Sequence, residues 1–178
     1  MAGVKLDISA GALLIFALAY FFDGSGMLSA LLPAAAVHEA GHVAALLACG
    51  ARIRRLRLDV FGLRLDYSGS LGCAASLFAA LAGPAAGLLY AFPAMRAAGQ
   101  ELKMSGAISL LLSGFNLLPA LPLDGGRALA LLCGSRTVRA CSRVTALLLM
   151  AAGLWALFAY GSLSMLVMGG WLLVYNAG

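Results

Sequence analysis

Both histidines of the chain lie in a single pentapeptide, His38-Glu39-Ala40-Gly41-His42. Residues four apart on an α-helix differ by about 40° in direction and about 6 Å in height, so two imidazoles at this spacing share a face and can chelate one metal ion. Glu39 points about 100° away from His38, which suits a carboxylate that removes a proton from metal-bound water instead of binding the metal. The pattern H-E-x-x-H on a helix is typical of zinc hydrolases.

An alternative is that these three polar side chains only form hydrogen bonds between helices. The pentapeptide interrupts an otherwise apolar run from Met27 to about Gly50. On the insertion scale, an Asp, Lys or Arg near the middle of a membrane costs at least ~2.5 to 3.5 kcal/mol. A bound metal ion therefore explains a cluster of titratable groups in a membrane span better than chance does.

The composition places the chain in a membrane. Of its 178 residues, 63% are hydrophobic and 11% are charged, whereas soluble domains carry about 25% charged residues. A single core of this size cannot hide so much apolar surface from water. A water-soluble enzyme is therefore excluded, and so is a disordered chain, because disordered chains are poor in aliphatic residues.

The apolar runs predict about six transmembrane helices in one domain over residues 1–178. Their approximate ranges are 8–22, 27–50, 71–95, 104–123, 144–160 and 163–175. The third run contains Gly83-Pro84, a kink or break, and Pro119 and Pro122 interrupt the end of the fourth. The last run is short for a span of ~20 residues, so five spans with a terminal in-plane helix is the alternative.

A short β-hairpin is expected between the second and third runs. Residues 56–60 and 63–67 alternate with period two, which predicts two strands that turn at Phe61-Gly62. The predicted fold class is thus an all-α polytopic membrane protein with one membrane-associated hairpin.

The basic residues predict the orientation. Six spans put residues 1–7, 51–70, 124–143 and the C-terminus on one side, which then carries ten of the twelve Lys and Arg residues. The positive-inside rule makes this side, with both termini, cytoplasmic. Because the charges punctuate apolar runs instead of forming one patch on a soluble domain, no nucleic-acid partner is expected.

A third metal ligand must come from outside the pentapeptide, because catalytic zinc takes three protein ligands and keeps one position for water. The remaining carboxylates are Asp7, Asp23, Asp59, Asp66, Glu101 and Asp124. Two of them lie on the other side of the membrane in the predicted topology, and three lie in charged surface segments. Asp124 follows a proline-broken segment that can stay within the membrane only where it lines a cavity. It is the predicted third ligand.

The histidine motif in one span, followed by Asn116 to Gly126 (NLLPALPLDGG) at the end of another, resembles the site-2 protease family of intramembrane zinc metalloproteases (peptidase M50). In particular, it resembles the bacterial branch typified by stage IV sporulation protein FB. The resemblance covers most of the chain and rests on two motifs in separate spans.

The resemblance implies one Zn²⁺ per chain, with His38, His42 and Asp124 as ligands and Glu39 as the general base. It assigns substrate binding to Asn116 and Pro122. Asn116 could instead form an interhelical hydrogen bond, and the proline could act only as a helix breaker. The hairpin could bind an unwound substrate by strand addition or could lie on anionic lipid.

The resemblance also implies a function in the cytoplasmic (inner) membrane of a bacterium. The expected activity is cleavage of a transmembrane or membrane-associated segment of another protein, in regulated intramembrane proteolysis, at a site nearer the cytoplasmic face. An inhibitory membrane partner is possible, and the oligomeric state is open. The alternative is a catalytically silent zinc-binding membrane protein or a metal transporter. A transporter needs ligands in both leaflets, and an inactive relative would usually have lost Glu39 or a ligand.

Overall fold

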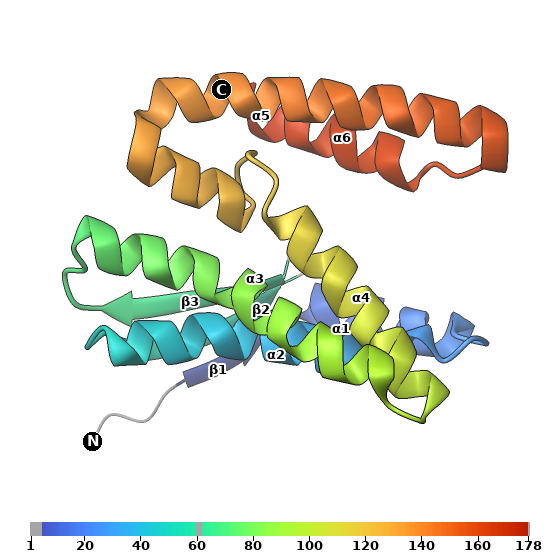
Figure 1. Cartoon of the computed structure of the whole chain (residues 1–178), viewed down its shortest axis with the longest axis horizontal. Helices are drawn as coiled ribbons and strands as arrows, with labels where there is room; N and C mark the ends of the chain where they lie inside the picture. Colours follow the sequence, from blue (N-terminus) through green and yellow to red (C-terminus); the bar gives the residue numbers. More distant parts are fainter. Residues whose placement is uncertain (1–4, 60–61, 178) are drawn as a thin grey trace. The chain divides into compact units, whose positions relative to one another are not determined.

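The computed structural model describes residues 5–59 and 62–177, and within them the chain is mostly helical with one small sheet (Figure 1). The helices are α1 (Ala10–Phe22), α2 (Met27–Ala48), α3 (Cys73–Arg96), α4 (Gln100–Asn116), α5 (Asp124–Tyr160) and α6 (Ser164–Tyr175). The strands are β1 (Lys5–Ile8), β2 (Arg52–Asp59) and β3 (Gly62–Ser68). Two compact units result: an N-terminal unit, Met1–Ser113, and a C-terminal unit, Gly114–Gly178.

The helices have the character of membrane spans. In the described part of the chain, α2, α3 and α5 are long and apolar enough to cross a bilayer, while α1 and α6 are shorter apolar helices. Large apolar side chains point outward: Leu89 is 76% exposed, Phe158 84% and Val174 77%. Such exposure would be costly in water but suits contact with lipid. The expected helical membrane protein is confirmed, and the count of six spans stays a prediction.

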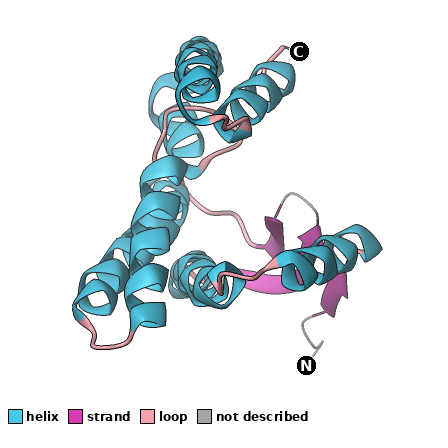
Figure 2. Ribbon diagram, turned by 90° about the vertical axis from the view of Figure 1, so that its right-hand side faces the viewer, coloured by secondary structure: helices cyan, strands magenta, loops and turns pink. Residues whose placement is uncertain are grey.

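The sheet has three strands, in the order β1-β2-β3 (Figure 2). β2 and β3 pair antiparallel, as the alternating sequence predicts, although Phe61 of the predicted turn lies outside the described residues. The predicted pair of strands is present, and its place at the membrane stays a prediction. A third strand, β1, was not predicted: it pairs parallel with β2 and places Leu6 opposite Leu56. Residues 5–7 precede the first predicted span, and residue 8 is the first residue of that span. The partner residues in β2 lie about fifty positions further along the chain. The four residues of β1 therefore carry no local pattern that predicts this pairing.

Close backbone contact joins α2 to α3 in the N-terminal unit. A Cβ on Gly41 would lie 2.5 Å from the carbonyl oxygen of Ala82, so only glycine allows the two helices to approach this closely. Next to the contact, a buried cluster joins the end of α2 to α3: Ala45, Leu46, Ala51 and Ala79. The helix that carries the histidine motif is therefore held rigidly against α3.

Small and hydroxylated residues join α3 to α4. The Ser109 hydroxyl donates to the carbonyl of Gly87 at 2.9 Å, and the hydroxyls of Tyr90 and Ser105 are 2.9 Å apart. In lipid, helices associate through close packing and interhelical hydrogen bonds, because the hydrophobic effect does not drive apolar helices together there. The serines of α4 thus face a partner helix.

The C-terminal unit consists of a loop over residues 117–123, a bent α5 and the antiparallel α6. α5 begins at Asp124, about twenty residues before the predicted fifth run, and bends at Gly134, whose φ is 81° (Figure 1). A buried cluster joins the loop to both helices: Ala120, Leu123, Ala146 and Leu172. Residues 124–143, which the predicted topology places between two spans, are therefore helical.

Candidate metal centre

The two histidines of the motif converge on one point in α2. Their Nε2 atoms lie 3.3 Å apart, and His38 is only 4% exposed. Two nitrogens that each lie 2.0–2.1 Å from a tetrahedral zinc ion are about 3.3 to 3.4 Å apart. The pair therefore fits two adjacent ligand positions of such an ion, as the i, i+4 spacing predicts.

A backbone carbonyl orients the second histidine. Nδ1 of His42 lies 2.7 Å from the carbonyl oxygen of Ala79 on α3. A carbonyl can only accept, so Nδ1 carries the proton and donates it to this bond. Nε2 is then left with the lone pair that a metal requires, and the ring cannot turn without losing the bond.

Gly83 leaves room for the same ring. A Cβ at this position would overlap the Nε2, Cδ2 and Cε1 atoms of His42. Pro84, which follows it, stays within α3 and is fully buried. The Gly83-Pro84 pair predicted as a kink thus gives the imidazole its space, in addition to any effect on helix geometry.

Glu39 is half-buried on α2, one residue after His38. One residue of an α-helix corresponds to about 100°, so its carboxylate leaves the helix in a different direction from the two imidazoles. This arrangement suits a base for a metal-bound water better than a third ligand on the same face.

Asp124 is the first residue of α5 in the C-terminal unit and is 5% exposed. The free N–H groups at a helix N-terminus stabilise a negative charge, which a carboxylate ligand must keep. Arg127, one turn later, places Nη1 3.8 Å from Oδ1 of Asp124. Gly125 and Gly126 pack against the backbone of the loop, where a Cβ would overlap Leu117 and Ala120.

The two predicted substrate-binding residues lie in the segment that precedes Asp124. Asn116 is the last residue of α4, Pro122 lies in the loop, and both are half-buried. Asn116, Pro122 and Asp124 therefore fall within nine consecutive residues of the C-terminal unit.

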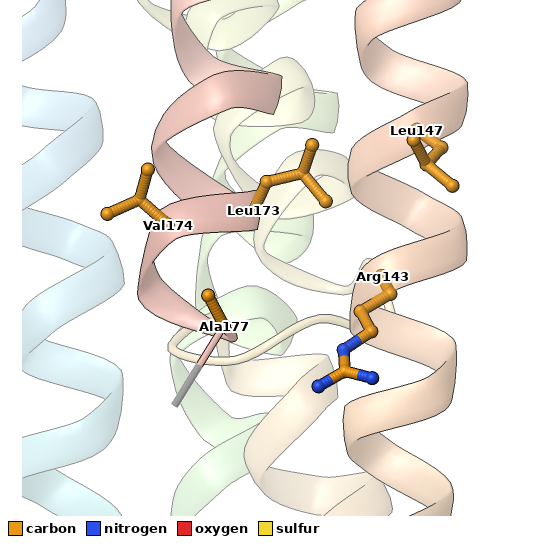
Figure 3. Close-up of a pocket in the computed structure, with 5 residues that line it drawn as sticks. All are labelled: Arg143, Leu147, Leu173, Val174 and Ala177. Carbon is orange, nitrogen blue, oxygen red and sulfur yellow. The ribbon is translucent and has the colours of Figure 1, made fainter.

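A shallow groove elsewhere in the C-terminal unit is separate from these residues. Its lining comes from α5, from α6 and from the residues that follow α6 (Figure 3): Arg143, Leu147, Leu173, Val174 and Ala177. The lining is mostly apolar, and none of its residues is a predicted ligand or base. This groove is not the candidate catalytic site.

Comparison with known proteins agrees with the geometry. The family model of peptidase family M50 matches residues 95–160, which contain Asn116, Pro122 and Asp124. A candidate zinc metalloprotease of Synechocystis sp. is 31% identical over 177 residues, covering 86% of this chain and 46% of the relative. The site-2 protease from Methanocaldococcus jannaschii has the same fold, with a TM-score of 0.69 and 19% identity over 99% of this chain and 91% of that one. The chain belongs to the site-2 protease family, peptidase family M50.

This M50 chain spans about half the length of the curated relative that it matches. The resemblance to the family is confirmed, and the likeness to the sporulation branch stays a prediction. The H-E-x-x-H motif lies outside the range matched by the family model, since that range begins at residue 95.

The residues that support the site in this family member were not predicted from the sequence. Ala79 acts through its carbonyl, which any residue type supplies, so no signal could have revealed it. Gly83 carried a weak signal, because an isolated glycine within a helical run often marks a close approach. Two further polar residues, Ser142 and Asn176, hold the loop before Asp124.

Proposed function

We propose that the chain is an intramembrane zinc metalloendopeptidase that cleaves a membrane-embedded or membrane-associated segment of another protein. One Zn²⁺ per chain is bound by His38, His42 and Asp124, and Glu39 is the general base. The observation that carries the proposal is the histidine pair, whose Nε2 atoms lie 3.3 Å apart with the second ring oriented by a carbonyl. Membership in the M50 family supports it.

Each residue of the proposed site has a defined chemical role. When bound, zinc would activate a water molecule and polarise the substrate carbonyl. The Glu39 carboxylate accepts the proton of that water and later donates it to the amine leaving group. Asp124 supplies an anionic oxygen whose charge the N-terminus of α5 stabilises. Asn116 and Pro122 hold the substrate backbone near the site, although the amide could instead serve only in a helix-to-helix hydrogen bond.

The substrate must be locally unwound. Peptide carbonyls within a helix are hydrogen-bonded and shielded, so a helical segment cannot present one to the zinc ion. In the water-poor surroundings of a membrane site, a bound zinc ion would stabilise a developing negative charge more strongly than it would in water. The sheet offers one way to hold an extended segment, by strand addition, and contact with anionic lipid is the other role open to it.

The setting we propose is the cytoplasmic membrane of a bacterium, with the site nearer the cytoplasmic face. The distribution of basic residues supports this orientation. Regulated proteolysis of a membrane protein, in the manner of the sporulation branch, is the process that fits such a site.

The test uses the full chain purified in detergent, with zinc stoichiometry and cleavage of single-span substrates as readouts. Glu39→Gln should keep about one zinc ion per chain and lose cleavage by roughly 10²- to 10⁴-fold, the usual contribution of a general base. Asp124→Ala should bind zinc more weakly. Glu101→Gln, which changes an exposed glutamate of α4, is the matched control and should cleave normally.

Three results would overturn parts of the proposal. Full cleavage by Glu39→Gln would remove the proposed base. Zinc affinity of Asp124→Ala equal to that of the wild type would remove the third ligand. Zinc binding by the wild type without cleavage of any substrate would favour the catalytically silent protein, and zinc flux into liposomes would favour the transporter.

A further inference from the structure

Leu121, in the loop before Asp124, has both of its backbone polar groups held by side chains from elsewhere in the C-terminal unit. Its N–H donates to the hydroxyl of Ser142 on α5 at 2.9 Å. Its carbonyl accepts from the Asn176 amide, at the end of α6, at 2.8 Å. The loop is thus clamped from two helices.

The two clamping side chains are themselves fixed. The Ser142 hydroxyl donates to the carbonyl of Val138 at 2.7 Å, and the Asn176 amide also donates to the carbonyl of Leu172 at 2.8 Å. Ser142 is 0% exposed and Asn176 4%. Because the hydroxyl proton and both amide protons are engaged, neither side chain can turn without losing a buried hydrogen bond.

The loop cannot supply these bonds itself. The N–H groups of Ala120 and Leu123 donate to carbonyls within the loop, and that of Leu118 donates to a carbonyl in the last turn of α4. Pro119 and Pro122 have no N–H to donate. Within residues 118–123, the Leu121 N–H is the one that a side chain satisfies. No water satisfies a free N–H within a membrane. Ser142 therefore completes the hydrogen bonding of this non-helical segment.

The clamp holds a residue that lies close to Asp124 in the chain. Leu121 precedes Asp124 by three residues, and the buried Leu123 between them is the N-cap of α5. We propose that Ser142 and Asn176 are positioning residues, which fix the loop and through it the Asp124 carboxylate for metal binding. This inference rests on the proposed function, in which Asp124 is the third zinc ligand. It also gives α6 a role in the site, because Asn176 follows its last turn.

The test compares metal binding by full-length variants in detergent. Asn176→Leu keeps the size of the side chain and removes its hydrogen-bonding groups, and Ser142→Ala removes one oxygen. Both should weaken zinc affinity, measured by competition with a chelator, by roughly 10- to 100-fold, as loss of groups that orient ligands usually does. The visible absorption spectrum of the Co²⁺-loaded variants should change as well, since it reports the geometry of the ligands.

Ser109→Ala is the matched control. Ser109 is also fully buried and also donates to a backbone carbonyl, but its partner is Gly87 on α3. We expect its zinc affinity and Co²⁺ spectrum to match those of the wild type. If Ser109→Ala weakened binding as much as Ser142→Ala, general loosening of the helices would explain the effect and the clamp would be disproved.

The remaining outcomes separate this inference from the function on which it rests. Wild-type metal affinity and spectrum in Asn176→Leu would disprove the positioning role and leave the zinc site intact. If Asn176→Leu fails to fold, the smaller change Ser142→Ala replaces it. Wild-type metal affinity and spectrum in Ser142→Ala would then disprove the positioning role. Absence of zinc binding by the wild type would overturn the proposed function instead. Hydrogen exchange would still test the clamp in that case, because the Leu121 N–H donates to the Ser142 hydroxyl. The Leu121 amide should exchange faster in Ser142→Ala than in the wild type.

Discussion

At the scale of single residues, Gly83 offers a direct test of the histidine site. The His42 ring bonds to the carbonyl of Ala79 and occupies the space that a side chain at Gly83 would fill. In Gly83→Ala the added methyl group would overlap the ring, so the imidazole must shift and give up its hydrogen bond. We expect zinc affinity to fall by roughly tenfold or more, measured by chelator competition, because losing the hydrogen bond that orients a metal-binding histidine usually costs this much.

Gly114→Ala is the control for this substitution. Gly114 also lies in a helix, α4, but a Cβ there meets no heavy atom within 4 Å. Its zinc affinity should stay at the wild-type value, and its melting temperature should be unchanged or higher, because alanine favours a helix over glycine by about 1 kcal/mol. Wild-type zinc affinity in Gly83→Ala would show that His42 does not bind metal through Nε2.

The histidine pair could be predicted from its spacing because its geometry is local. His38 and His42 converge because i, i+4 spacing on any α-helix brings side chains together. Ser142 and Asn176 could not be predicted, because their bonds to Leu121 join residues 21 and 55 positions apart. Serine and asparagine occur in many surroundings, and only the packed structure shows which carbonyl or amide they reach.

At the scale of elements, an aspartate outside α2 caps the helix that carries the histidine motif. The N-cap of α2 is Gly26, which has no side chain to accept from the first N–H groups. The Asp23 carboxylate takes this place and accepts from the N–H of Leu28 at 2.6 Å and of Met27 at 2.9 Å. The start of α2 therefore depends on a charged group in the preceding loop.

This cap predicts a pH dependence of stability. The N–H of Leu28, followed by those of Met27 and Ser25, holds the pKa of Asp23 below its ordinary value of 3.8. A carboxyl whose pKa is lowered on folding stabilises the protein above its unfolded pKa, and this stabilisation is lost as the pH falls through the folded pKa. Asp23→Asn should thus lower the melting temperature at neutral pH, and the difference from wild type should shrink below about pH 4.

Ser29→Ala is an uncharged control at the same helix start, where the Ser29 hydroxyl donates to the carbonyl of Gly26. Its effect on the melting temperature should not depend on pH over this range. A difference between wild type and Asp23→Asn that stayed constant from pH 7 to pH 3 would contradict the proposed role of the charge.

Hydropathy located the elements that are long and apolar, and it was least informative at their ends. The run predicted over 27–50 corresponds to α2, and the run over 71–95 corresponds to α3. β1 was missed because its pairing with β2 is non-local, although Asp7 and Arg55 form an ion pair across these strands. The helical start of α5 at Asp124 was missed because glycines and arginines there resemble a surface connector.

At the scale of the whole molecule, α6 bears on how often the chain crosses the membrane. Its 12 residues span about 18 Å, less than the ~30 Å of a bilayer core. It nevertheless packs antiparallel to α5, since Gly153 contacts Leu166 and Gly169 contacts Met150. Asn176, at the end of α6, and Ser142, on α5, both form hydrogen bonds with Leu121. The end of α6 therefore lies at the same level as Ser142.

Hydropathy alone could not decide between six spans and five with an in-plane terminal helix, because it measures how apolar a segment is and not how deep it lies. The packing within the C-terminal unit favours the crossing. Ala177 and Arg143 line the same groove, so the end of the chain and the basic half of α5 lie at the same level of that unit. If the positive-inside rule holds for Arg143, the C-terminus is cytoplasmic.

Single-cysteine labelling tests this orientation in intact cells. In a variant whose four native cysteines are replaced, cysteine is placed singly at the exposed positions Ser25, Ser135 or Ala177. A membrane-impermeant maleimide added to intact spheroplasts should label Ser25→Cys. It should label Ser135→Cys and Ala177→Cys only after permeabilisation, because both positions lie with the basic residues. Labelling of Ala177→Cys from outside, with Ser135→Cys still protected, would show that α6 does not return across the membrane. That result would replace six spans by five and would separate Asn176 from the loop that it is proposed to hold.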